Sequence, residues 1–412
     1  MSSSRFAAKP IFVLLLILTI SGIAASQSIA TFKEKADKGD AEAQDMLGRF
    51  YNSGSNGAEK DFAEAVRWYR KSADQGNADA QLCLGFAYYY GNGVTADHTE
   101  AVRWWRKSAE HGYSLAQYKL GELYYKGQDV AQDYAEALKW YRLAAESGDD
   151  DAMTMVGNIY HQGWGISQNY TEAQHWYQLA ADKGNTLAMF ILGGMYENGE
   201  GVVTDYSKAA LLYRKAAEEG FAEAQFFLGN MYREGRGVPQ DYAQAAVWYR
   251  KAAEQGVSGA QFRLGELYDY GQGMPQDYSQ AVLWFRKSAQ QGNAFAQFDL
   301  AARYSHGEGG VPKDDAQAAL WLRKAAEQGL ADAQYILGVS YYLGQGVPQD
   351  YGEAYFWLDL SATGKLEKSK PEDAAKGRDF AASHLTNTVL LQTQERARKW
   401  FEDHPGRPNP LN

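Results

Sequence analysis

The residues that could carry chemistry are few and scattered along the chain. The 412 residues include one cysteine, Cys83, and seven histidines, at positions 98, 111, 161, 175, 306, 384 and 404. His161 and His175 could meet across two neighbouring helices, but a metal site needs three or four converging ligands. A chance pair of surface histidines explains them better, so the sequence predicts no metal site.

The sequence motifs of the common hydrolases do not occur. Ser-x-x-Lys, Lys-Thr-Gly, Gly-x-Ser-x-Gly and His-Glu-x-x-His are all missing, so serine acyl transfer and zinc hydrolysis lack their starting residues. Cys83 lies in the middle of a predicted helix with no histidine near it in sequence, which indicates an inert thiol. We therefore expect no enzymatic activity and no cofactor.

Gly-x-Gly pairs such as Gly91-Asn92-Gly93 and Gly235-Arg236-Gly237 resemble parts of phosphate-binding loops. Those loops follow a β-strand, whereas here a predicted helix precedes each pair. We interpret the glycines as helix stops.

The elements that would position any site recur every 36 residues. One glycine marks the period, at positions 48, 85, 121, 157, 193, 229, 265 and 338, with Ala301 in the same slot. The steps are 36 residues except for single insertions before Gly85 and before Gly338. A fixed period of this size indicates a solenoid, in which each unit packs on its neighbours.

Each unit reads as two helices. Ala80, Leu84, Ala87 and Tyr88 follow the i, i+4, i+7, i+8 pattern of one helical face. Gly85 lies inside this helix, where glycine costs about 1 kcal/mol relative to alanine. A cost that recurs in nearly every unit predicts that the partner helix approaches closely at this position.

The second helix begins at an acid in most units. Asp61 with Glu64 has capping-box spacing, and the same arrangement recurs along the chain. Asp205 with Lys208 breaks the pattern, which predicts a weaker helix start there. Tryptophans from Trp68 onward recur on the shoulder of this helix, a position that favours packing onto the adjacent unit.

The N-terminus has the pattern of a secretory signal peptide. Arg5 and Lys9 precede an apolar run at 11–20, and small residues follow it. The run is shorter than the ~20 apolar residues that span a bilayer. Without residues 1–26 the chain has 39 basic and 51 acidic residues, a net charge of −12, which disfavours nucleic acid and anionic membranes as partners.

The ends differ from the repeats, as the ends of a solenoid must. After the repeats we expect two further helices, 371–385 and 388–402. The predicted organisation is a signal peptide 1–26, a partial helix 27–40, an array of nine repeats 41–364, capping helices 365–404 and a disordered tail 405–412.

The repeat motif resembles the Sel-one-like repeat (SLR), a relative of the tetratricopeptide repeat. Residues 224–229 (Ala-Gln-Phe-Phe-Leu-Gly), 235–242 (Gly-Arg-Gly-Val-Pro-Gln-Asp-Tyr) and 248–253 (Trp-Tyr-Arg-Lys-Ala-Ala) carry the resemblance. It implies an all-α fold, a right-handed superhelical α/α solenoid of about nine helix-turn-helix repeats of 36 residues. It also implies an adaptor or scaffold. Exported bacterial members are linked to envelope regulation, polysaccharide secretion and host contact. A cysteine-rich branch was described as β-lactamase-like, but this chain lacks its paired cysteines.

In related arrays the first helix of each pair lines the concave groove. The groove slot three residues before the repeat glycine holds Tyr118, Phe190, Phe226, Phe262, Phe298 and Tyr335. Charged residues fill nearby slots: Glu122, Glu197, Glu223, Arg233, Arg263, Glu266 and Asp269. The aromatic column either contacts a peptide or protein partner or packs within the array. Both interpretations stay open at this point.

The sequence thus predicts an exported, non-enzymatic scaffold that binds other proteins or peptides. We expect a monomer in the periplasm, with no membrane insertion after signal cleavage. One alternative is a secreted factor for host-cell interaction. Another is a hydrolase of β-lactams or cell-wall material, which the missing motifs disfavour.

Overall fold

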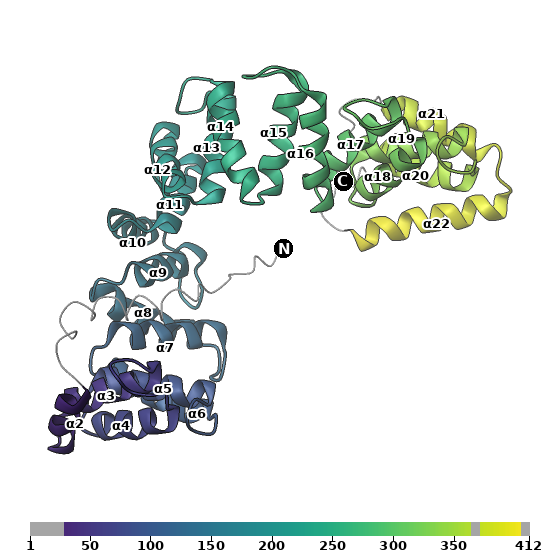
Figure 1. The fold of residues 1–412 in the computed structure, drawn as a ribbon. Helices are drawn as coiled ribbons and strands as arrows, with labels where there is room; N and C mark the ends of the chain where they lie inside the picture. The colour runs from purple at the N-terminus through teal and green to yellow at the C-terminus, as the bar shows by residue number, and fades with distance from the viewer. Residues whose placement is uncertain (1–28, 364–370, 405–412) are drawn as a thin grey trace. The chain divides into compact units, whose positions relative to one another are not determined.

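The computed structural model describes residues 29–363 and 371–404, and every regular element within them is an α-helix (Figure 1). The expected all-α fold of paired helices is confirmed. The predicted signal peptide and the predicted C-terminal tail lie outside the described residues.

The helices alternate between the first and the second member of each repeat. The first helices are α3 (Ala41–Ser53), α5 (Ala78–Tyr90), α7 (Ser114–Lys126), α9 (Asp150–Gln162), α11 (Thr186–Asn198), α13 (Ala222–Glu234), α15 (Ser258–Tyr270), α17 (Ala294–His306) and α19 (Ala331–Leu343). The second helices are α4 (Phe62–Asp74), α6 (His98–Glu110), α8 (Tyr134–Glu146), α10 (Tyr170–Asp182), α12 (Tyr206–Glu218), α14 (Tyr242–Glu254), α16 (Tyr278–Gln290), α18 (Asp315–Glu327) and α20 (Tyr351–Thr363). The chain forms two compact units, one ending at Ala188 and one beginning at Met189.

The repeat glycine faces an aromatic ring of the second helix. A Cβ atom on Gly48 would lie 2.5 Å from the Tyr69 ring, and one on Gly229 would lie 2.6 Å from the Tyr249 ring. Real Cβ atoms do not come this close to another atom. The predicted close approach is therefore correct, but a ring from the partner helix, rather than its backbone, requires the glycine.

The eighth repeat departs from this pairing. Ala301 takes the place of the glycine, and Leu322 takes the place of the ring. Both residues are buried, at 1% and 5% exposed. The ninth repeat keeps Gly338 and also has a leucine, Leu358, whose Cγ would lie 2.7 Å from an added Cβ.

The two loop glycines have different roles, so our interpretation of both as helix stops was incomplete. Gly235 ends α13 in the left-handed conformation, with φ of 70°, as expected of a helix C-cap. Gly237 also has φ of 71°, but a Cβ there would collide with the carbonyl oxygen of Tyr206 in the preceding repeat. The second glycine therefore lets one repeat's loop lie directly on the previous second helix.

The predicted N-caps form, including the one expected to be weak. The Asp61 carboxylate accepts a hydrogen bond from the backbone N–H of Glu64 at 3.0 Å. Asp205 accepts one from the backbone N–H of Lys208 at 2.9 Å. The backbone N–H of Asp61 and that of Asp205 both donate to a carbonyl of the preceding helix, those of Tyr51 and Tyr196, so neither cap has the returning side-chain bond of a capping box. The weaker start of α12 stays a prediction.

Two side chains join successive repeats. Trp284 lies in one apolar cluster with Ala245 and Tyr249 of the preceding second helix. The glutamine of each Ala-Gln motif donates to a carbonyl at the end of the preceding second helix, as Gln261 does to Ala253 at 3.1 Å. The Ala253 carbonyl also accepts the backbone N–H of Gly256 at 3.1 Å, so the glutamine is a second donor to it. The same glutamine bond recurs at Gln44, Gln81, Gln117, Gln225, Gln297 and Gln334.

Helices outside the period flank the repeats. α2 (Ile29–Asp37) precedes the first repeat and receives the bond from Gln44. α21 (Pro371–Ala382) and α22 (Asn387–Asp403) follow the last one. Ala381 and Ala397 of these helices share an apolar cluster with Trp357 of α20, so they cover the last repeat.

Candidate protein-interaction surface

The aromatic column packs largely within its own repeats. Ring centroids lie 5.4 Å apart for Tyr118 and Tyr141, and 5.9 Å apart for Phe226 and Tyr249. The same contact joins Phe190 to Tyr213 at 5.6 Å and Phe262 to Phe285 at 5.9 Å. These four column rings therefore pack on the ring that faces the repeat glycine, whereas Phe298 and Tyr335 belong to the two repeats that have a leucine in place of that ring.

Burial separates the six column residues into two groups. Phe262 and Phe298 are 7% and 8% exposed, so little of either ring could touch a partner. Tyr118, Phe190, Phe226 and Tyr335 are half-buried, and each keeps some ring surface. Direct contact between this column and a partner stays a prediction.

Two aromatic rings that are more exposed than those of the column lie at repeat positions that the sequence did not single out. Phe295 in α17 is 50% exposed, and its centroid lies 5.9 Å from that of Phe262. Tyr270 at the end of α15 is 62% exposed. The slot of Tyr270 also holds Tyr90, which is 65% exposed, and the slot of Phe295 holds leucines in two other repeats. The residue type in both slots changes irregularly from repeat to repeat, so no regular period marked these two rings.

The charged residues beside the column are mostly paired inside the chain. The guanidinium of Arg263 contacts Glu266 at 2.7 Å, and that of Arg303 contacts Asp269 at 2.7 Å. Burial acts to raise the pKa of Glu122, but hydrogen bonds from Lys119 and Lys126 outweigh it and leave the pKa lowered. Because of these ion pairs, most of the charged side chains beside the aromatic column already have a partner within the chain.

The histidines and the cysteine that the sequence offered for chemistry pack against other side chains of the repeats. The His161 ring packs against Tyr170 and Tyr177, and the His175 ring packs against Trp176. Among residues 29–363 and 371–404, no three His, Cys, Asp or Glu side chains gather as a metal site would require. Burial raises the pKa of the Cys83 thiol to about 12, which keeps it in its unreactive protonated form.

No helix in the described part of the chain is both long enough and apolar enough to cross a bilayer.

Two solved structures similar to this chain are bacterial repeat proteins. A protective antigen of uropathogenic Escherichia coli strains with an SLR fold is 33% identical, with a TM-score of 0.67, over 94% of this chain and 96% of that one. A Sel1 repeat protein of Oxalobacter formigenes is 33% identical, with a TM-score of 0.60, over 80% of this chain and 90% of that one. No curated protein matches the sequence.

The Sel1 repeat model matches nine consecutive segments: 41–77, 78–113, 114–149, 150–185, 186–221, 222–257, 258–293, 294–330 and 331–365. Each segment contains one pair of helices and the glycine or alanine that faces the second helix. The chain belongs to the Sel1 repeat family.

Proposed function

We propose that this protein is a non-enzymatic scaffold of the bacterial cell envelope that binds other proteins or peptides. The observation that carries the proposal is the unbroken array of Sel1 repeats, because repeat arrays of this kind present extended surfaces to partners. The described residues contain no metal-ligand cluster, and the half-buried Cys83, whose thiol pKa is raised, is not an activated nucleophile.

The exposed rings of the first helices are the surface that we assign to partner contact. Phe295 and Tyr270 present large apolar areas to solvent, and aromatic side chains are enriched among residues that dominate binding energy. Phe226 in α13 is half-buried and keeps some ring surface for contact. The ring of Phe262 packs against that of Phe295 and so helps to hold it in position.

A second candidate function is a secreted factor that contacts host cells. The observation that favours it is the 33% identity, over 94% of this chain, to a protein described as a protective antigen of uropathogenic bacteria. Cell fractionation separates the two candidates. Recovery of the chain in osmotic-shock fluid supports the envelope scaffold, and recovery in culture supernatant supports the secreted factor.

The test of partner binding is affinity capture with the full chain carrying a C-terminal tag, from envelope extract, with mass-spectrometric identification. The test variant is Phe295→Ser with Tyr270→Ser. The matched control is Leu283→Ser with Leu211→Ser, which removes leucines that are 44% and 54% exposed on second helices. We expect a partner that the control retains and the test variant loses. A partner that both variants retain would contradict the assigned surface, and the absence of any specific partner would contradict the scaffold.

A further inference from the structure

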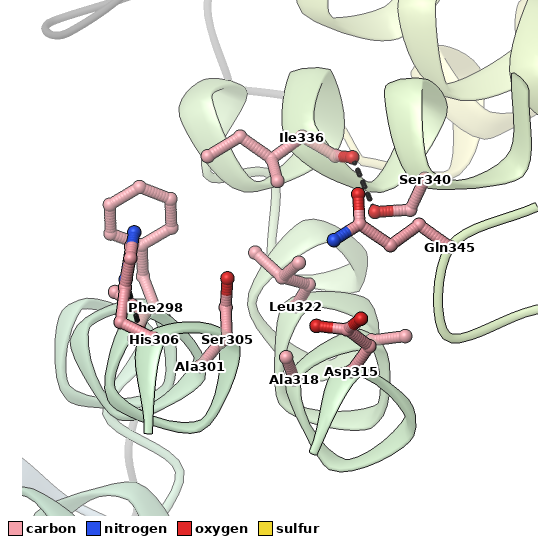
Figure 2. A pocket seen from close by; sticks show the side chains of 12 residues that line it. Phe298, Ala301, Ser305, His306, Asp315, Ala318, Leu322, Ile336, Ser340 and Gln345 are labelled. Atoms are coloured by element: carbon pink, nitrogen blue, oxygen red, sulfur yellow. Dashed lines mark hydrogen bonds between the residues drawn. The ribbon is translucent and has the colours of Figure 1, made fainter. Parts of the chain in front are cut away.

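A cavity of about 130 Å³ lies where α17, α18 and α19 meet (Figure 2). Phe298 and Ala301 of α17, Leu322 of α18 and Ile336 of α19 form its apolar wall. Ser305, His306, Asp315, Ser340 and Gln345 add polar groups. Ile336 at its edge is 38% exposed, so the cavity is open to solvent.

The cavity exists because large side chains of the repeat are replaced here. At the junction of α14 and α15, Tyr242, Tyr249 and Leu267 belong to one apolar cluster. The equivalent slots at the junction of α18 and α19 hold Asp315, Leu322 and Ser340. Two rings and one leucine are thus lost, and the single methyl group gained at Ala301 does not replace their volume.

Asp315 is the most unusual of these replacements. It is the first residue of its second helix, and an aromatic or imidazole ring takes that position in the other eight repeats. Those rings are Phe62, His98, Tyr134, Tyr170, Tyr206, Tyr242, Tyr278 and Tyr351. A carboxylate there does not fill the space, so packing alone does not explain it.

The Asp315 carboxylate has an unsatisfied oxygen. Its Oδ1 atom is buried and has no hydrogen-bond partner. Figure 2 shows the carboxylate and the Gln345 side-chain amide turned toward the open space. Of the 12 residues that line the cavity, Asp315 is the only one that carries a carboxyl group. A buried carboxylate oxygen is costly until a donor reaches it.

We propose that this cavity receives the side chain of a lysine or arginine from a partner protein. The aliphatic stem of such a side chain lies along Leu322 and Ile336, and its cationic group donates to Asp315 Oδ1. The volume suits one side chain, since an engineered apolar cavity of about 150 Å³ holds a benzene molecule. The chain's net charge of −10 also favours a basic partner.

This inference rests on the proposed scaffold function and adds the chemistry of the residue that the partner presents. It concerns a cavity at the junction of the eighth and ninth repeats, apart from the exposed rings of the preceding subsection. Its test uses small probes, so it does not depend on capturing a partner.

The test titrates the full chain with n-butylammonium and, separately, with 1-butanol, which has the same stem but no charge. Ligand-observed NMR supplies both dissociation constants. We expect the ammonium to bind about tenfold tighter or more, the range for a hydrogen bond to a charged group. Equal affinities, tighter binding of the alcohol, or binding of neither probe would overturn the proposal.

Three variants locate the effect. Asp315→Asn keeps the shape of the side chain and should abolish the preference for the ammonium. Asp74→Asn, an exposed carboxylate on α4, is the matched control and should change nothing. Ala301→Gly with Leu322→Phe restores the usual glycine and ring, and should abolish binding of both probes at an unchanged or higher Tm. Retained preference in Asp315→Asn would overturn the assignment to Asp315 while leaving the scaffold proposal to the capture experiment.

Discussion

The junction of α14 with α15 and the junction of α18 with α19 use the same positions of the repeat in opposite ways. At the first junction, Tyr249 is fully buried and packs beside Gly229. At the second, Leu322 and Ala301 occupy those slots, and a cavity opens beside them. Each ring that faces this slot in the first seven repeats is opposite a glycine, so the ring requires the glycine. The converse does not hold, because the eighth repeat has lost both and the ninth keeps Gly338 opposite Leu358.

The two junctions share two backbone contacts. In both, the loop of the following repeat lies on the start of the second helix, through Gly273 on Tyr242 and Gly346 on Asp315. In both, a glutamine bonds to the end of that helix, from Gln261 or from Gln334. The backbone frame is constant, and only the side chains that fill it change.

The largest effect is expected from substitutions in the backbone arrangement that the two junctions share. Gly273→Ala and Gly346→Ala should each destabilise the protein by about 3 kcal/mol or more, because the methyl group meets backbone atoms and the residue is left-handed. Urea unfolding followed by circular dichroism measures the loss. The cap glycines Gly271 and Gly344 are the controls, and alanine there should cost about 1–2 kcal/mol. Losses no larger than those of the controls would show that the loop can lift away.

The next largest effect is expected when a substitution opens a cavity at the filled junction of α14 and α15. Tyr249→Leu should lower the free energy of unfolding by about 2 kcal/mol, since it removes a fully buried ring. Differential scanning calorimetry or chemical unfolding measures the change. The reverse conversion, Ala301→Gly with Leu322→Phe, should not lower stability. A larger loss in the reverse conversion than in Tyr249→Leu would contradict the equivalence of the two junctions.

A smaller effect measures the coupling of glycine and ring. Gly229→Ala alone should destabilise, because its Cβ would lie 2.6 Å from the Tyr249 ring. In the Tyr249→Leu background the same change should cost less. The double-mutant cycle should show a coupling of about 1 kcal/mol or more. Additive effects would mean that Ala301 and Leu322 occur together for another reason.

The smallest effect concerns Asp315 and stability. Asp315→Asn should change the free energy of unfolding by no more than about 0.5 kcal/mol. A carboxylate at the start of a helix gains from the helix dipole, but its unpaired Oδ1 offsets that gain. Thermal unfolding at neutral pH measures the difference. A large loss would indicate that Asp315 serves the fold rather than a ligand.

Much of this structure could be predicted from the period of one glycine. Helix pairs, caps and helix ends follow from spacing alone, because each depends on residues within a single repeat. The role of Gly85 was predicted only in part, since its partner ring, Trp105, lies 20 residues further along the chain. The joint change at Ala301 and Leu322 was readable in the sequence, but Gly338 with Leu358 in the ninth repeat obscures the pairing.

The candidate site was less predictable, for physical reasons. The column slot holds aromatic residues in most repeats, but whether Phe262 is buried or Phe226 half-buried depends on neighbours such as Phe295. The cavity was missed because it results from three substitutions in two repeats, and only the packing of α18 on α19 brings them together. The bonds from Gln261 and its equivalents join repeats, and no pattern within one repeat reports them.

The measurement that tests this account most directly is a crystal structure of the full chain soaked with n-butylammonium. The account predicts difference density for one molecule between α17, α18 and α19, with its nitrogen about 3 Å from Asp315 Oδ1. It also predicts none at the filled junction of α14 and α15. Side chains that collapse into the cavity, or density that places no cation beside Asp315, would contradict it.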